Sequence, residues 1–368
     1  MRLNRPDTLN VVLGYRCNAQ CRHCCTSCGP REDESAARRF LGGIAVSAGT
    51  YLDTFPQLTE ESVVGLVELA GQTPTITRVS FTGGEPILFK PVLLAGLRRA
   101  KGYGLATRVV SNASWAKTPE AAERIVGQLA DAGLGQLTLS CSDYHSEFVE
   151  LDCLRHALQA ALTTNLEVGF SIITRNGGQV STAFLKDYLA VPEELVDRRV
   201  FFFETPVMAT GRGDTLPAED FFEEYPQVNA HGRCDVAGRT PTVTPDGRLM
   251  ACCGFPYREI PELDFGSIEA GLSGPMRDLE QDFLVFWVRA VGPYGILRRL
   301  GLGRLPEFSN ICQACRFLFV ERESRQRLAE YLDTHTPEEI FQEEILGWES
   351  TPKPEEHSGE EMRSSVKA

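Results

Sequence analysis

The sequence predicts an α/β fold built on a parallel sheet, followed by a small cysteine-rich C-terminal domain. Two observations support this fold class. Six short runs of β-forming residues alternate with helical segments over residues 1–213, as consecutive βα units do. From about Asp214 the alternation stops, and cysteines, glycines and turn residues become frequent. Periodicity alone does not separate a curved barrel from a flat, doubly wound sheet.

The predicted strands are short and rich in apolar and β-branched residues, and they cover Leu9–Leu13, Thr77–Phe81, Ala106–Val110, Gln136–Cys141, Glu167–Thr174 and Val200–Glu204. Helices are expected between them. The first begins after Thr59, a suitable N-cap residue, and others cover 88–101, 119–132 and 147–162. Residues 28–58 contain turn residues and a charged run, and we expect an insertion over the mouth of the barrel there.

Residues 214–332 form the predicted second domain. Its segment 233–264 has no helical period and contains a Pro-Asp-Gly turn at 245–247. Helical segments are expected at 268–290 and 316–332, with a Gly-rich link between them. A C-terminal helix is expected within 333–350, over 337–346, and the polar tail 351–368, rich in Pro and Glu, is expected to be disordered.

Composition limits the cellular setting. The 368 residues include 42% hydrophobic and 24% charged residues, typical of a water-soluble globular protein. A net charge of −13 disfavours nucleic acid as a partner. Twelve cysteines without a secretory signal favour metal binding over disulfides, and hence a reducing cytoplasm. The apolar segment 283–297 is interrupted by Arg289, Gly292 and Pro293, so no membrane partner is expected.

A cysteine triplet follows the first predicted strand. Cys17, Cys21 and Cys24 are separated by three and two residues. Three thiolates at this spacing can bind three irons of a [4Fe-4S] cluster from one loop and leave the fourth iron open to a chelating substrate. Zinc is the alternative, because Cys21/Cys24 and Cys25/Cys28 each form a C-x-x-C pair.

A second motif, Thr-Gly-Gly-Glu-Pro at residues 82–86, follows the second predicted strand. Together with the triplet it resembles the radical S-adenosylmethionine (SAM) superfamily. The resemblance implies a partial (β/α)6 barrel and a flavodoxin- or ferredoxin-type electron donor. It also implies a [4Fe-4S] cluster that reductively cleaves SAM to methionine and a 5′-deoxyadenosyl radical. It assigns the cluster to Cys17, Cys21 and Cys24, and the amino group of SAM to Gly83, Gly84, Glu85 and Pro86.

Further SAM contacts are implied at the carboxyl ends of strands, where barrels build their sites. The candidates are His23, Ser111, Asn112, Ser140 and Arg212. Each is also an ordinary loop residue type, and a solvated loop arginine is an equal alternative for Arg212. Asp143 and His145 follow the fourth strand and are candidate catalytic residues that face the substrate.

The C-terminal cysteines resemble the auxiliary-cluster region called SPASM, or its shorter form, twitch. No cysteine follows Cys315, which favours the shorter form. The resemblance implies one auxiliary [4Fe-4S] cluster. Cys252 is one of its implied ligands, and the neighbouring Cys253 is the alternative at that position. A four-cysteine zinc site also remains open. The implied ligands are Cys234, Cys252, Cys312 and Cys315.

Five cysteines have no implied ligand role: Cys25, Cys28, Cys141, Cys153 and Cys253. Most are expected to be buried as small apolar residues. A thiol near the radical can instead donate a hydrogen atom to a carbon radical, because its S–H bond is weak. Cys141 and Cys253 are the candidates, and Cys253 is the predicted catalytic thiol.

The predicted function is that of a radical SAM oxidoreductase that abstracts hydrogen from a substrate. Enzymes of this architecture include many that modify ribosomal peptides and others that act on small natural products such as aminoglycosides. Peptide maturation is the prediction, and dehydrogenation or epimerisation of a small molecule is the alternative. An iron–sulfur electron carrier would need no SAM pocket, so the Gly-Gly-Glu-Pro segment argues against it.

Overall fold

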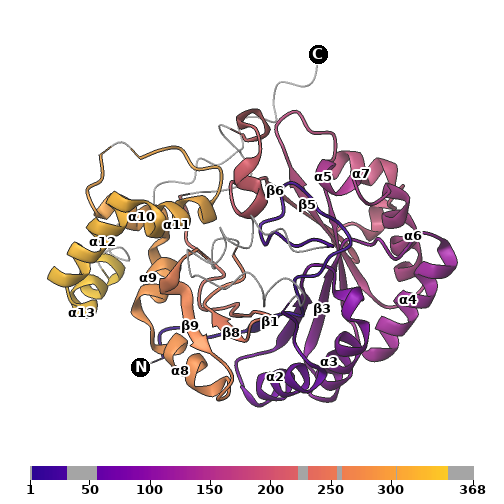
Figure 1. The fold of residues 1–368 in the computed structure, drawn as a ribbon, viewed down its shortest axis with the longest axis horizontal. Coiled ribbons are helices and arrows are strands. Elements are labelled where there is room, and N and C mark those ends of the chain that lie inside the picture. Colours follow the sequence, from indigo (N-terminus) through magenta and orange to yellow (C-terminus); the bar gives the residue numbers. More distant parts are fainter. Residues whose placement is uncertain (1, 31–55, 223–230, 255–258, 304, 347–368) are drawn as a thin grey trace, which may run out of the picture.

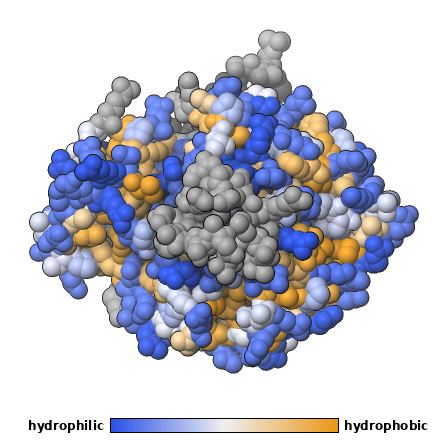
Figure 2. All heavy atoms as spheres, in the orientation of Figure 1, coloured by the Kyte–Doolittle hydropathy of each residue, from blue (hydrophilic) through white to orange (hydrophobic). Residues whose placement is uncertain are grey.

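The computed structural model describes residues 2–30, 56–222, 231–254, 259–303 and 305–346. Figure 1 shows a strongly curved sheet with helices α2, α3, α4, α6 and α7 on its outer side and a second group of helices, α8 to α13, on the side of β8 and β9. Hydrophilic residues cover much of the face in Figure 2, with hydrophobic patches between them, as on an ordinary water-exposed surface.

The described strands form one sheet in the order β6-β5-β4-β3-β2-β1-β7-β8-β9. Strands β1 to β6 pair in parallel, and β6 and β9 lie at opposite ends, so the sheet is not closed. The prediction of a partial (β/α)6 barrel is therefore confirmed. The six barrel strands are β1 (Thr8–Val12), β2 (Arg78–Thr82), β3 (Ala106–Ser111), β4 (Gln136–Cys141), β5 (Glu167–Thr174) and β6 (Val200–Pro206).

The outer helices are α2 (Glu60–Gln72), α3 (Lys90–Gly102), α4 (Pro119–Ala132), α6 (Leu151–Leu162) and α7 (Thr182–Tyr188), whereas the short α5 (Asp143–Ser146) follows β4 at the mouth of the barrel. Thr59 caps α2 as predicted, accepting a hydrogen bond from the Ser62 N–H at 3.1 Å. The helix predicted over 147–162 is α6, which begins four residues later at Leu151, and the short α5 before it was not predicted. Helix α7 was not predicted, because seven residues are too few to show a helical period.

The barrel has an apolar outer face and a polar inner face. Helix α4 buries Ala122, Ile125, Val126 and Leu129, which follow helical spacing, against the sheet. On β1, by contrast, Leu9 and Val11 are fully buried on the outer side, whereas Asn10 between them joins Thr242 by a hydrogen bond of 3.2 Å. Polar inner positions leave room for ligands, and the outer side supplies most of the hydrophobic stabilisation.

The C-terminal part continues the same sheet. Strand β7 (Thr242–Val243) pairs in parallel with β1, and a hairpin turn at Gly247, with φ +71, leads into antiparallel β8 (Arg248–Met250) and β9 (Asp264–Ser267). The helices that follow are α8 (Ser273–Gln281), α9 (Phe283–Val291), α10 (Pro293–Arg299), α11 (Ile311–Val320), α12 (Arg322–Thr334) and α13 (Pro337–Ile340), with a π-helical turn over Phe341–Leu346.

Three helix predictions in this part were wrong. The segment 268–290 is two helices, since Asp282 ends α8 and caps α9 through the Val285 N–H at 2.7 Å. The segment 316–332 is likewise divided between α11 and α12. The predicted link contains α10, which Pro293 begins with a preset helical φ.

The predicted insertion and tail fall mostly on residues 31–55 and 347–368, which lie outside the described residues. The boundary between the predicted domains at 213/214 stays a prediction. Among the described helices, none combines the length and the apolar character that crossing a membrane requires.

Replacement of Phe170 tests the outer core. Phe170 on β5 is fully buried and stacks on Phe202 with ring centroids 5.2 Å apart. We expect Phe170→Ala to lower the free energy of unfolding by about 3–5 kcal/mol, because it leaves a cavity. Urea unfolding measures the change. Phe148, 46% exposed, is the matched control, and Phe148→Ala should stay within about 0.5 kcal/mol of the parent. Equal losses in both variants would contradict this account of the core.

Candidate cofactor and substrate site

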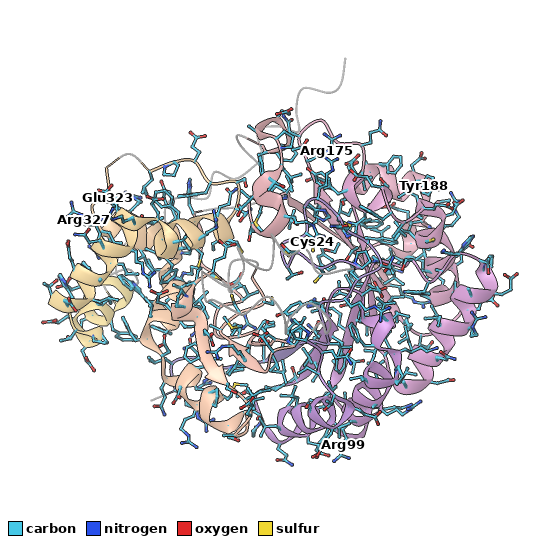
Figure 3. All side chains as sticks on the ribbon, in the orientation of Figure 1. Cys24, Arg99, Arg175, Tyr188, Glu323 and Arg327 are labelled. Carbon is cyan, nitrogen blue, oxygen red and sulfur yellow. The ribbon has the colours of Figure 1, made fainter. Side chains whose placement is uncertain are left out.

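A cavity of about 240 Å³ opens at the carboxyl ends of the barrel strands. Its wall combines the cysteine loop, the Gly-Gly-Glu-Pro turn, the ends of β3 to β5 and the segment after β6. In Figure 3, Cys24 lies on the inner side of the curved sheet, between the barrel and the C-terminal helices. The sequence-predicted residues that line the cavity are Cys17, Cys21, His23, Cys24, Gly83, Gly84, Ser111, Asn112, Ser140, His145 and Arg212.

The cysteine loop places three thiols at one end of the cavity. Its backbone turns where the Cys24 N–H donates to the Cys21 carbonyl at 3.1 Å, and it is anchored where the Cys17 N–H donates to Gly29 at 3.0 Å. The Ala19 N–H lies 3.4 Å from the sulfur of Cys17. The local bonds thus shape the loop independently of any metal.

Arg212 binds this loop from the segment after β6. Its Nε donates to the carbonyl of Cys21 at 3.0 Å and its Nη2 to the carbonyl of Cys28 at 2.6 Å. Among the described residues, buried Nη1 has no hydrogen-bond partner. Gly211 allows this close approach, since a Cβ there would lie 2.4 Å from the Cys25 carbonyl oxygen. Arg212 therefore organises the loop and keeps one donor for a ligand.

The Gly-Gly-Glu-Pro turn packs directly against the same loop. A Cβ on Gly84 would lie 2.2 Å from the Arg16 carbonyl oxygen, and one on Gly83 would lie 2.8 Å from that of Gly14. The Gly84 N–H donates to Gly14 at 2.8 Å. Only glycine permits this packing, which joins the ends of β1 and β2.

Glu85 is buried behind the cavity wall, with 1% exposure. Its carboxylate accepts hydrogen bonds from Ser111 Oγ at 2.8 Å, the Asn112 N–H at 2.9 Å and the Ile87 N–H at 3.1 Å. Burial raises its pKa to about 7. Glu85 does not line the cavity, so its direct effect is to tie the turn to the end of β3. Pro86 is also buried and begins the 3-10 helix η1 (Pro86–Phe89).

Asn112 connects β3 to the cysteine loop. Its Nδ2 donates to Asn18 Oδ1 at 3.1 Å and lies 3.7 Å from the sulfur of Cys17. Ser111, next to it, lines the cavity as well. The ends of the first three strands therefore form one connected wall.

Two histidines form an aromatic corner of the cavity. His23 stacks on Tyr144 at 4.9 Å and meets His145 edge-on at 4.7 Å. His145 Nδ1 shares a hydrogen bond of 2.8 Å with Ser142 Oγ. Burial lowers the pKa of His145 to about 4 and that of His23 well below its usual value. Both rings are therefore neutral at pH 7, and buried His23 Nδ1 has no partner among the described residues.

Asp143, which we expected to face the substrate, points to a different part of the structure. Its carboxylate accepts from the Gln179 N–H at 2.9 Å and the Val180 N–H at 3.4 Å. It does not line the cavity. Asp143 thus holds the loop after β5.

Several lining residues were missed by the sequence analysis. Ser171 pairs in register with Ser140 across β4 and β5, so strand alternation was the signal that could have found it. The residues after β6 carried no such signal, because they lie on an irregular segment. The missed lining residues are Ala19, Cys25, Thr26, Cys28, Thr82, Val110, Ser171, Ile173, Pro206, Val207, Met208 and Thr210.

The C-terminal cysteines gather from three separate segments. Cys252 lies within electrostatic range of Cys234, Cys312 and Cys315, and burial raises the pKa of its thiol well above the usual value. The Cys253 thiol also lies within electrostatic range of Cys252, as well as of Cys234 and Arg108. Among the described residues, no three His, Cys, Asp or Glu side chains are placed to hold one metal ion.

The open parallel barrel, the cysteine loop after β1 and the Gly-Gly-Glu-Pro turn after β2 are the arrangement that the resemblance to the radical SAM superfamily implies. The chain is 22% identical over 340 residues to the putative peptide biosynthesis protein YydG of Bacillus subtilis (strain 168), covering 89% of this chain and 97% of the relative. No protein-family model matches the chain.

Two solved structures show weaker similarity. That of BtrN in complex with AdoMet and 2-DOIA has a TM-score of 0.45 and 14% identity, covering 80% of this chain and 89% of that chain. That of methylornithine synthase (PylB) has a TM-score of 0.39 and 13% identity, covering 60% of each chain. Neither similarity specifies the substrate of this chain.

The buried carboxyl of Glu85 makes stability depend on pH. Its pKa of about 7 in the folded state exceeds the ordinary 4.5, so the folded state binds this proton more tightly than the unfolded state. Protonated Glu85 therefore contributes its full share to the free energy of unfolding below pH 4.5. This share is lost as the pH rises through about 7. Glu85→Gln removes the titration.

We therefore expect the melting temperature of the parent, minus that of Glu85→Gln, to fall between pH 5 and pH 8. The measurement is thermal unfolding of the SAM-free protein at several pH values. A difference that stays constant across this range would show that Glu85 titrates normally.

Proposed function

We propose that this enzyme matures a peptide by abstracting a hydrogen atom from it with a SAM-derived radical. The observation that carries the proposal is the cavity in which three loop thiols, a glycine turn and the polar ends of β3 to β5 converge. The peptide substrate is supported by the similarity, along nearly the whole chain, to a protein named for peptide biosynthesis.

The residues present fit the expected cofactors. Cys17, Cys21 and Cys24 would hold a [4Fe-4S] cluster, and such a cluster supplies the electron that cleaves SAM into methionine and a 5′-deoxyadenosyl radical. Two buried nitrogens that line the cavity, Arg212 Nη1 and His23 Nδ1, have no partner among the described residues. Buried polar atoms are normally satisfied, so these two indicate a polar ligand.

Different residues of the cavity wall would bind different parts of SAM. The backbone of Gly83 and Gly84 is open to the cavity, while Glu85 keeps the turn and the end of β3 in place. Asn112 and Ser140 offer polar side chains, and Arg212 offers the Nη1 donor to a carboxylate. His23 is stacked and neutral, which suits contact with a flat, uncharged ring.

Two further residues act on the neighbouring space. His145 lines the cavity and, being neutral at pH 7, contributes an uncharged wall that excludes water from the radical. Asp143 acts indirectly by positioning the loop after β5. An external flavodoxin- or ferredoxin-type protein would supply the electron.

The second cluster belongs to the proposed domain 214–332. Cys234, Cys252, Cys312 and Cys315 would hold it, because these four thiols lie within electrostatic range of Cys252 or Cys315. Asn310 caps α11 and sets the first turn, on which Cys312 lies, by accepting from the Gln313 N–H at 3.0 Å. With four thiolates the cluster would have no open iron.

Cys253 is the proposed hydrogen-atom donor. Its thiol lies within electrostatic range of Arg108, whose strand position is on the inner side of the barrel. Transfer of a hydrogen atom forms a C–H bond on the substrate radical and breaks the S–H bond. The resulting thiyl radical regains its hydrogen by taking one electron from the external donor and one proton from water.

Loss of the triplet tests the proposed chemistry. A Cys17→Ala/Cys21→Ala/Cys24→Ala variant should lose about half its iron and all formation of 5′-deoxyadenosine, because one of two equal clusters is gone. Iron analysis and chromatography of dithionite-reduced samples with SAM measure both. Cys153→Ala, which changes a buried thiol on α6, is the control and should retain iron and activity. Continued SAM cleavage by the triple variant would refute the proposal.

A second set of variants tests the auxiliary ligands. Cys312→Ala/Cys315→Ala should lose about half the iron yet still form 5′-deoxyadenosine, while peptide product disappears. Cys253→Ala should keep all iron and lose product. If Cys253→Ala loses the auxiliary iron and Cys252→Ala keeps it, the ligand assignment between these neighbours is reversed.

A further inference from the structure

His23, which lines the cavity, packs against a fully buried tyrosine. Tyr144 lies on α5, directly after β4, and its ring stacks on the imidazole of His23 with centroids 4.9 Å apart and planes 20° apart. Tyr144 itself does not line the cavity. The contact therefore joins the cysteine loop to the end of a barrel strand from behind the cavity wall.

The hydroxyl group of Tyr144 is held by a buried carboxylate. It donates a hydrogen bond of 2.8 Å to Oδ2 of Asp220, a residue that is 5% exposed. Arg175, in the loop after β5, donates to the other carboxylate oxygen of Asp220 at 3.0 Å. The Asn176 N–H donates to the Asp220 carbonyl at 2.9 Å. Because both carboxylate oxygens and the backbone of Asp220 are engaged, the position at which it accepts from Tyr144 is fixed.

Tyr144 is anchored at both ends of its side chain. Burial, together with the hydrogen bond to Asp220, raises the pKa of Tyr144 above its usual value, so its hydroxyl remains a donor at pH 7. Hydrogen bonds to a charged group are roughly twice as strong as neutral ones. The ring belongs to a small apolar cluster that also contains Val207 and Leu216. Interiors of this kind are close-packed, so the anchored ring keeps one orientation.

The contacts that orient the ring of His23 are aromatic. Its buried Nδ1 has no hydrogen-bond partner among the described residues. Tyr144 stacks on the ring, and His145 meets it edge-on at 4.7 Å. The outer torsion of a histidine side chain is broad, so an imidazole that lacks such contacts samples several planes. Stacking on Tyr144 therefore restricts the plane that His23 presents to the cavity.

We propose that Tyr144 is a positioning residue: held by Asp220 and Arg175, it sets the plane of His23 against the purine ring of SAM. This inference rests on the proposed function, in which His23 contacts a flat, uncharged ring. The charged methionine part of SAM is assigned there to other parts of the wall, the glycine turn and Arg212. Loss of the tyrosine hydroxyl therefore weakens binding of the purine part and spares the methionine part.

The size of the effect follows from the fraction of molecules in which His23 is correctly oriented. When a ligand binds only one orientation, its apparent dissociation constant rises in inverse proportion to that fraction. A histidine side chain has about six rotamers, so complete release of His23 raises the dissociation constant of SAM by up to about sixfold. Partial release, with a phenylalanine ring still stacked on His23, gives a smaller rise.

Equilibrium dialysis of the anaerobically reconstituted enzyme, without reductant, tests the inference with two probes, SAM and methionine. Tyr144→Phe should raise the dissociation constant of SAM about threefold, and Tyr144→Leu should raise it by up to about sixfold. Both variants should leave the dissociation constant of methionine unchanged. Iron content and the visible spectrum should also match those of the parent, because the thiols of the cysteine loop are untouched.

Tyr188 on α7 provides a matched control. Its hydroxyl donates to Asp152 Oδ1 at 2.9 Å, and Arg155 pairs with the same carboxylate, so the arrangement repeats that of Tyr144. In Figure 3, Tyr188 lies on the outer side of the barrel, away from Cys24. Tyr188→Phe should therefore leave the dissociation constants of both SAM and methionine at the parent values.

A double-mutant cycle determines whether Tyr144 acts through His23. In His23→Ala enzyme, Tyr144→Phe should have no further effect on SAM binding, because the ring that it positions is absent. Independent effects of the two substitutions would overturn the proposal. An equal loss of SAM and methionine binding would also overturn it, since the variant would then disturb the whole cysteine loop, and so would an unchanged SAM constant in both Tyr144 variants. Binding does not require turnover, so failure of the parent to cleave SAM would refute the proposed function and leave this inference standing.

Discussion

The site depends on close backbone contact between two loops that are far apart in sequence. Gly84 lies so near the Arg16 carbonyl that no side chain fits between them, and the Gly84 N–H also bonds to Gly14. This contact fixes the glycine turn to the cysteine loop. Because the loops end adjacent parallel strands, strand pairing in the sheet below sets their separation. The thiols and the glycine turn therefore reach the same cavity.

Two ionisable residues support this contact, Arg212 from the cavity wall and Glu85 from behind it. Arg212 binds carbonyls of Cys21 and Cys28 across more than 180 residues of sequence, and Glu85 binds donors at the end of β3. Hydrogen bonds that involve a charged group contribute about 1.5–3 kcal/mol each, twice a neutral one. The loop geometry is thus stabilised by the protein itself. Such preorganisation reduces the entropy lost when a cofactor binds.

The inner and outer faces of the barrel differ in polarity. The outer face is apolar, and an apolar outer face would suit barrel enzymes with many different chemistries. Inside, Thr138 Oγ1 is buried and has no hydrogen-bond partner among the described residues, whereas Arg108 is only partly buried and its Nε donates to Ser80 Oγ. Leaving a buried hydroxyl unsatisfied costs about 1–3 kcal/mol.

The sequence by itself determined the local elements and the triplet. The six barrel strands were predicted within about two residues, because β-forming runs and turn residues act over short distances. The cysteine spacing indicated its chemistry for the same reason, since one loop provides all three thiols. Tertiary structure alone decided the rest: that Glu85 faces Ser111 rather than the cavity, that Asp143 holds a loop, and that Arg108 lacks a carboxylate partner among the described residues. These facts depend on strand register and on contacts between residues many positions apart, which no local pattern encodes.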